Sequence, residues 1–193
     1  MKEQSIIMTA ESVRKILAGT KTHTRRVFTH TIGNVSKFLT LEGDVVSPQE
    51  MLNRRPGNAA FLLGSSPYGV IGGRVWVRES WCELIHGEKA MYRADIDKYA
   101  ESIQWNRAIH MPRWASRIML EITGINLQRV QEMTREDAIA EGMTREERWN
   151  CYGTGSVEKD AYAELWDSLN AKRGYSWAKN PWVWVIKFKQ VKE

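Results

Sequence analysis

Residues 181–189 read Pro181-Trp182-Val183-Trp184-Val185-Ile186-Lys187-Phe188-Lys189, and the alternation in this stretch decides the fold. The four even-numbered side chains are bulky and apolar, whereas the odd-numbered ones after the proline pass from valine to lysine. Successive side chains of a β-strand point to opposite faces of a sheet. The stretch therefore predicts a strand with one continuous apolar face.

Shorter stretches upstream also predict strands. In residues 75–79, two valines alternate with Trp76 and Arg78, which predicts a strand. Ile118, Leu120 and Ile122 fall on every second position of another run. The apolar run at residues 6–8 and the stretch at 91–93 predict two further strands.

Three segments carry helix signals. Residues 9–19 combine an N-cap threonine, apolar side chains at helical spacing and a closing glycine. Residues 134–142 begin with the form of a capping box and also end on glycine, and residues 158–170 carry apolar side chains at i, i+3, i+4 and i+7. Strands and helices do not alternate strictly, so the sequence predicts an α+β fold with a small mixed or antiparallel β-barrel and packed short helices, not a doubly wound parallel sheet.

The length and composition predict one domain over residues 1–193, with insertions around 30–70 and 85–115. The two cysteines, Cys82 and Cys151, are far apart in the chain and outside any metal-binding spacing, which is typical of free thiols in a reducing compartment. We expect no membrane segment, and the cytoplasm is the expected location. The four histidines show no ligand spacing, so no metal or cofactor is expected.

Positive charge and tryptophan together suggest the kind of ligand. The formal net charge is +5, and nine tryptophans occur in 193 residues. Several tryptophans stand near arginines, and such pairs can stack bases and hold phosphates. The alternative for most of them is a tryptophan-rich core covered by arginine side chains. We predict that a ligand-binding surface draws on these residues: Trp76, Arg78, Glu79, Arg113 and Trp114.

The segment Thr20-Lys21-Thr22-His23-Thr24-Arg25-Arg26 follows directly after a helix stop and is too polar to continue the helix. It predicts an ordered loop or an edge strand. An extended segment would place Thr22 and Thr24 on the same side, with fixed charge from Arg25 and Arg26. Such a patch could hold phosphate, or Lys21, kept deprotonated by burial and by the arginines, could draw a proton from Thr24. The alternative is a solvated basic turn.

The same segment resembles the G-x-K-T-x-T-x-R signature at the start of ASCH domains, a family with a PUA-like barrel. Gly19, Lys21, Thr22, Thr24 and Arg26 fall on this pattern. Residues 73–79, 109–117 and 180–186 look like the larger ASCH-like proteins of phages and prophages, while residues 30–69 and 145–155 have no match.

The resemblance implies a site and an activity. Some small bacterial ASCH proteins are amidohydrolases that remove the acetyl group of N4-acetylcytidine with a Lys, a Thr and a Glu. Lys21 and Thr24 match the first two, and residues 132–143 are similar to the segment that carries the glutamate, which places Glu141 third. Glu141 ends a helix, where the helix dipole disfavours a carboxylate unless a cation or a proton accompanies it. The alternative is an exposed glutamate at a frayed helix end.

The implied mechanism is acyl transfer. Thr24 would be the nucleophile, Lys21 the base, and Glu141 the group that orients the lysine or passes the proton to the leaving amine. Arg26 or a backbone N–H would stabilise the oxyanion, and a tryptophan such as Trp76 would stack on the base.

Three functions therefore remain open. The first is hydrolysis of an acylated pyrimidine nucleoside, and the second is binding of single-stranded RNA or a modified base without turnover. The third is a ribonuclease, as proposed for some ASCH proteins; it ranks last because no cluster of carboxylates or histidines suits a metal-dependent form. The partner expected in each case is a nucleoside or single-stranded RNA.

Overall fold

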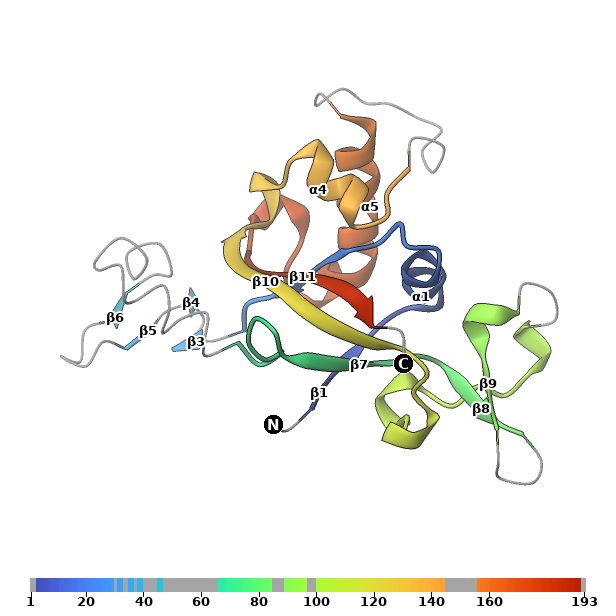
Figure 1. Ribbon diagram of the computed structural model, residues 1–193. Helices are drawn as coiled ribbons and strands as arrows, with labels where there is room; N and C mark the ends of the chain where they lie inside the picture. Colours follow the sequence, from blue (N-terminus) through green and yellow to red (C-terminus); the bar gives the residue numbers. More distant parts are fainter. Residues whose placement is uncertain are drawn as a thin grey trace.

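The computed structural model describes residues 3–29, 31–32, 35–36, 38–39, 45–46, 66–84, 89–96, 100–144 and 156–191. Its centre is a mixed sheet of five strands in the order β1-β7-β10-β11-β2 (Figure 1). β1 and β7 run parallel, and each of the other neighbouring pairs is antiparallel. The five strands are β1 (Gln4–Ile7), β2 (His23–Val27), β7 (Arg74–Arg78), β10 (Met119–Arg129) and β11 (Trp182–Val191).

Smaller elements surround this sheet. β8 (Trp81–Glu83) pairs with β9 (Ala90–Tyr92), and two-residue strands pair as β3 (Thr31–Ile32) with β4 (Val35–Ser36) and β5 (Phe38–Leu39) with β6 (Val45–Val46). The rest of the predicted insertion at 30–70 lies largely outside the described residues. The second predicted insertion, at 85–115, contains 3₁₀ turns, among them η2 (Ala100–Ser102), η3 (Ala108–His110) and η4 (Arg113–Ala115).

The alternation in β11 separates two cores, one on each face of the sheet. The even-numbered side chains from Trp182 to Phe188 all pack in the first core, with Leu120 and Ile122 of β10. Val183 and Val185 pack in the second core, and Lys187 and Lys189 are exposed. The division of this strand into two faces is therefore confirmed.

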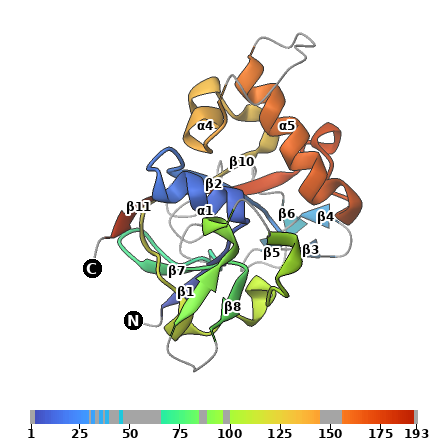
Figure 2. The same cartoon turned by 90° about the vertical axis from the view of Figure 1, so that its right-hand side faces the viewer.

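One helix covers the first core and two cover the second (Figures 1 and 2). α1 (Ala10–Leu17) buries Val13 and Ile16 against the first core. α4 (Arg135–Ala140) and α5 (Val157–Asn170) pack over the opposite face through Ala138, Tyr162 and Trp166. No described helix is both long enough and apolar enough to cross a bilayer.

The α+β class with a mixed sheet is confirmed, but the expected barrel is not closed within the described residues. β1 and β2 are the two outer strands of the sheet, and no main-chain pairing joins them in the part of the chain described. Instead Arg26 of β2 donates a hydrogen bond from its guanidinium to the carbonyl of Ile7 in β1. Charged side chains on an outer strand discourage further strand pairing, and β2 carries two adjacent arginines. We call this unpaired junction of β1 and β2 the seam.

Candidate functional site

Two helix ends position Lys21. Gly19 adopts a left-handed backbone conformation with φ 75°, which ends α1 and turns the chain back. The backbone N–H of Lys21 then donates to the carbonyl of Lys15, 3.1 Å away, and the N–H of Thr22 donates to the carbonyl of Ala140 at the end of α4, at 2.8 Å. The predicted edge strand, β2, starts at the next residue. Lys21 is thus fixed between the C-terminal ends of α1 and α4.

The Lys21 amine contacts Glu141 twice. Nζ donates to carboxylate Oε2 at 2.5 Å and to the backbone carbonyl of the same residue at 2.9 Å. The other carboxylate oxygen, Oε1, accepts from Arg25 at 3.2 Å, and Arg25 also lies 2.8 Å from Asp137. Lys21 and Glu141 are 6% and 2% exposed, respectively. Of the two alternatives predicted for a carboxylate at this helix end, a cation or a proton, the structure shows cations, Lys21 and Arg25.

Burial shifts the pKa values of Lys21 and of the neighbouring Tyr162. It lowers the pKa of Lys21 below its usual range, although the Glu141 carboxylate acts in the opposite direction. Burial also raises the pKa of Tyr162, and the nearby charge of Glu141 adds to this effect. A lysine with a lowered pKa is a better general base near neutral pH.

α4 holds Glu141 at its C-terminal cap. The helix starts at a capping box in which Thr134 and Asp137 exchange hydrogen bonds. It ends as Met143 donates to the carbonyl of Ala138 and Gly142 takes φ 89°. Both ends of the helix are therefore fixed by the local sequence, which sets the position of the carboxylate.

Thr24 and Arg26 lie on the same face of β2 as Phe28, which packs in the first core. Arg25 points to the opposite face. Thr24 is 4% exposed. Phe28 donates to the carbonyl of Trp182, so the even-numbered residues of β2 turn their main-chain groups toward β11. The N–H and C=O of Arg25 accordingly point away from β11, along the free edge of the strand.

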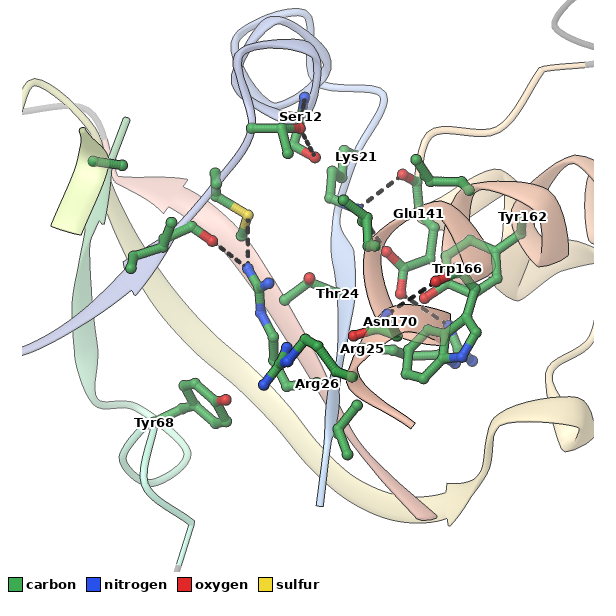
Figure 3. A pocket seen from close by; sticks show the side chains of 18 of the residues that line it. Ser12, Lys21, Thr24, Arg25, Arg26, Tyr68, Glu141, Tyr162, Trp166 and Asn170 are labelled. Carbon is green, nitrogen blue, oxygen red and sulfur yellow. Dashed lines mark hydrogen bonds and ion pairs between the residues drawn. The ribbon is translucent and has the colours of Figure 1, made fainter. Parts of the chain in front are cut away.

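A cavity of about 590 Å³ lies at the seam and collects these groups. Lys21, Thr24 and Glu141 all line it, as do Arg25 and Arg26. Figure 3 shows the Lys21–Glu141 pair and Tyr68 on opposite sides of Thr24 and Arg26. Three aromatic side chains also contribute to its wall: Tyr68, Tyr162 and Trp166. Its volume falls in the range of roughly 300–1,000 Å³ that is usual for small-molecule sites.

The other predicted site residues lie elsewhere. Thr22 is exposed and contacts His23 through its hydroxyl, 2.9 Å from Nδ1. Trp76 is covered by guanidinium groups of Arg78 and Arg113, at 4.6 and 5.9 Å from its ring centroid. None of these residues lines the cavity in the described part of the chain, so Trp76 is not placed to stack on a base there.

Trp114 and Glu79 also lie outside the cavity. Trp114 is 56% exposed and packs edge-on against Trp81. Glu79 is buried and receives two hydrogen bonds from Arg117, at 3.0 and 3.1 Å, and Arg117 also binds Asp95. This arrangement ties the end of β7 to the start of β10 and gives Glu79 a structural contact, not a place in the cavity.

Several residues of the cavity escaped the sequence analysis. Tyr162 and Trp166 were expected only as the apolar face of α5, although that periodicity could have marked them as a wall. Asp137, outside the cavity, falls in the predicted capping box of residues 134–142 and also binds Arg25. Tyr68 and Arg173 lie in stretches without a period or motif, so no local signal pointed to them.

Comparisons with known proteins give similar solved structures but no sequence match. One is a protein from Enterococcus faecalis V583, described by the family model DUF984, with a TM-score of 0.45 and 10% identity; it covers 99% of this chain and 78% of its own. Another is an ASCH domain from Lactobacillus crispatus JV V101, with a TM-score of 0.38 and 12% identity over 94% of this chain and 69% of its own. No family model and no curated protein matches the sequence.

Proposed function

We propose that this protein binds an acylated pyrimidine nucleoside at the seam and hydrolyses its exocyclic amide, as in N4-acetylcytidine. The observation that carries the proposal is the buried contact between Lys21 and Glu141 in the wall of a cavity that Thr24 also lines. An amine, a hydroxyl and a carboxylate from distant parts of the chain thus border one small-molecule-sized space. The resemblance of residues 19–26 to the ASCH signature supports the same reaction.

The chemistry proceeds in two acyl transfers. The Thr24 hydroxyl attacks the acyl carbon while its proton passes to the neutral amine of Lys21. The tetrahedral intermediate collapses, the exocyclic amine of the base leaves with that proton, and the acyl group remains as an ester on Thr24. Water then attacks the ester through the same base, Thr24 regains its proton, and the carboxylic acid departs. Glu141, held by Arg25, orients the lysine amine throughout.

The rest of the cavity suits recognition of a base. The aromatic wall offers apolar faces, and base stacking on such side chains stabilises binding by about 1–3 kcal/mol per base. The free main-chain edge of Arg25 offers one donor and one acceptor for the polar edge of a pyrimidine. A nucleoside-related ligand therefore accounts for both the apolar and the polar parts of the lining.

Matched substitutions at one position test the nucleophile. Thr24→Val keeps the shape of the side chain but removes the hydroxyl, so we expect it to reduce kcat/KM on N4-acetylcytidine by about a thousandfold or more. Thr24→Ser keeps a hydroxyl and is expected to stay within about tenfold of the wild type. The exposed Thr123 of β10 provides the control, because Thr123→Val removes a hydroxyl far from the chemistry. Mass analysis of the product and of the acylated enzyme measures each variant.

The outcomes separate the three functions. Release of cytidine that fails in Thr24→Val but not in Thr24→Ser supports the amidohydrolase. Binding of a nucleoside or of single-stranded RNA without turnover of N4-acetylcytidine would leave a binding module, and cleavage of the RNA would indicate a ribonuclease. Equal turnover by Thr24→Val and the wild type would remove Thr24 from the mechanism.

A further inference from the structure

The charges that line the cavity do not balance. Lys21 and three arginines line it, Arg25, Arg26 and Arg173, and among the described lining residues Glu141 is the one carboxylate. Glu141 is shared by Lys21 and Arg25, and Arg25 has a second carboxylate partner outside the cavity. Neither Arg26 nor Arg173 forms an ion pair with any described residue. Among the described residues, the arginines of the cavity therefore outnumber their carboxylate partners, and a neutral nucleoside would leave Arg26 and Arg173 uncompensated.

The two arginines reach the cavity from different elements, β2 and the turn after α5. Arg26 is two residues beyond Thr24 on the same face of β2, a separation of about 7 Å along a strand. It contacts the carbonyl of Ile7 and the sulfur of Met8, and its Nε has no hydrogen-bond partner among the described residues. Arg173 ends the 3₁₀ turn η7 (Ala171–Arg173) that follows α5, and its side chain is exposed.

Tyr68 lies at the end of the cavity where Arg26 is found. Figure 3 places it across Arg26 from the Lys21–Glu141 pair. Burial raises the pKa of Tyr68, and the charges of Arg26 and Arg173 oppose this rise, which is consistent with both guanidinium groups lying near its hydroxyl. This end of the cavity therefore combines two cations with a phenol, donors that suit the oxygens of a phosphate.

We propose that the ligand is a nucleotide, whose phosphate binds between Arg26, Arg173 and Tyr68 while its base reaches Lys21 and Thr24. This inference rests on the proposed function for the position of the base. It adds a substrate class, since an acylated cytidine 5′-monophosphate, not the free nucleoside, would compensate both arginines. Phosphate groups are bound by arginine through paired hydrogen bonds, which fixes the orientation of the whole ligand.

Binding tests the phosphate independently of turnover. Titration calorimetry with cytidine and with cytidine 5′-monophosphate is expected to give a Kd at least about tenfold lower for the monophosphate. Added salt should reduce this ratio, because an exposed arginine is screened. Arg173→Gln should move the ratio toward one, whereas Lys172→Gln, at the exposed neighbouring position, should leave it unchanged.

Further arms identify the source of the phosphate and separate the two proposals. Inorganic phosphate should compete only weakly, because it lacks the base, and competition as strong as that of the monophosphate would overturn the nucleotide assignment. Tighter binding of a short cytidine-containing RNA strand would overturn it in favour of a polymer. Equal Kd values for cytidine and its monophosphate would overturn the phosphate site while leaving amide hydrolysis intact. Tight monophosphate binding without hydrolysis of its N4-acetyl form would remove the amidohydrolase and keep the nucleotide site, and binding of neither ligand would overturn both.

Discussion

A buried lysine in contact with a carboxylate can be a structural ion pair or a catalytic base. Loss of solvent disfavours a charged amine, while the partner carboxylate favours it. In Lys21 the effect of burial is the larger of the two, so its pKa lies below the usual range. The side chain also borders a cavity beside Thr24, where a neutral amine has a hydroxyl to deprotonate. A lowered pKa and a place in the cavity wall are what the proposed role of Lys21 as a base requires.

The pH dependence of turnover tests this role. A general base must be neutral to act, so kcat/KM on the acylated nucleoside should rise with pH, and its midpoint should fall below the usual pKa of a lysine. Measurements between about pH 5 and pH 10 define this limb. Thr24→Ser should keep the same midpoint, since Lys21 is unchanged. A rate that falls as pH rises through the same range would contradict a neutral lysine.

Sequence alone identified the residues of the site that carry a local signal. Lys21 and Thr24 stand in a segment that resembles the ASCH signature, and Glu141 falls in residues 132–143, which are similar to the segment that carries the family's glutamate. Arg173 and Tyr68 could not be predicted, because they reach the cavity through the packing of α5 and of the turn before β7. Trp76 was predicted as a site residue because arginines stand near it in sequence, but these arginines cover its ring. The ring lies on the face of the sheet opposite the first core.

Among the elements, the C-terminal end of α4 has the greatest influence on the site. Gly142 ends the helix with φ 89°, and a Cβ built there would come within 2.7 Å of the Lys15 side chain. Gly174 has nearly the same φ, 88°, but nothing lies within 4 Å of its Cβ position. The two glycines thus separate backbone strain from contact with neighbours.

We predict that Gly142→Ala destabilises the protein by more than Gly174→Ala. The backbone strain alone should cost each variant about 1 kcal/mol, and the contact with Lys15 adds to it only at position 142. Gly142→Ala should also reduce turnover, because Glu141 is its neighbour. Denaturant unfolding and kcat/KM measure the two effects. Equal losses of stability and of activity in both variants would show that the Lys15 contact has no influence.

The ion pair between α4 and α5 supports the same region. Glu158 in the first turn of α5 accepts hydrogen bonds from Arg135 in the first turn of α4 at 2.9 and 3.1 Å, and from Ser156 at 3.1 Å. The Arg135 guanidinium and the backbone N–H at the helix start lower the pKa of Glu158 to about 2. The two helices that contribute Glu141 and Tyr162 are thus tied together at one end.

This pair predicts a particular response to acid. Because the folded pKa of Glu158 is depressed, its contribution to stability is present above the pKa of an unfolded glutamate and is lost as pH falls toward about 2. Glu158→Gln should therefore be less stable than the wild type at pH 7, and the difference should shrink in acid. Glu83→Gln, at an exposed position of β8, provides the control. Thermal unfolding as a function of pH measures both, and a difference that grows in acid would contradict the prediction.

For the whole molecule, the alternation of side chains correctly predicted the strands and their faces, but not whether the sheet closes into a barrel. The faces of β11 and the α+β class could be predicted from periodicity, because each side chain signals its own environment. Whether β1 and β2 pair could not, since strand pairing depends on residues far apart in sequence. The two arginines of β2 are themselves a signal against strand pairing, but they were interpreted only as residues that bind a ligand.

The shared strand also predicts how the chain unfolds. β11 contributes neighbouring side chains to both cores, so neither core should lose its packing alone. Tryptophan fluorescence and far-UV circular dichroism should give one midpoint in denaturant. Ile186→Val in the first core should shift both signals together by about 0.5–1.5 kcal/mol, and Val185→Ala in the second should also shift them together. Two separate midpoints would indicate that residues 1–193 contain more than one cooperative unit.

At the seam, no backbone hydrogen bonds between β1 and β2 close the sheet in the described part of the chain. The Arg26 side chain spans the gap between β1 and β2, where a fifth strand pairing would close the sheet into a barrel. A ligand bound at the proposed site would exchange hydrogen bonds with the free edge of β2, as a sixth strand would do in a closed barrel. Residues that border the gap without packing in either core, such as Arg26 and Arg173, can therefore change and alter specificity at little cost in stability.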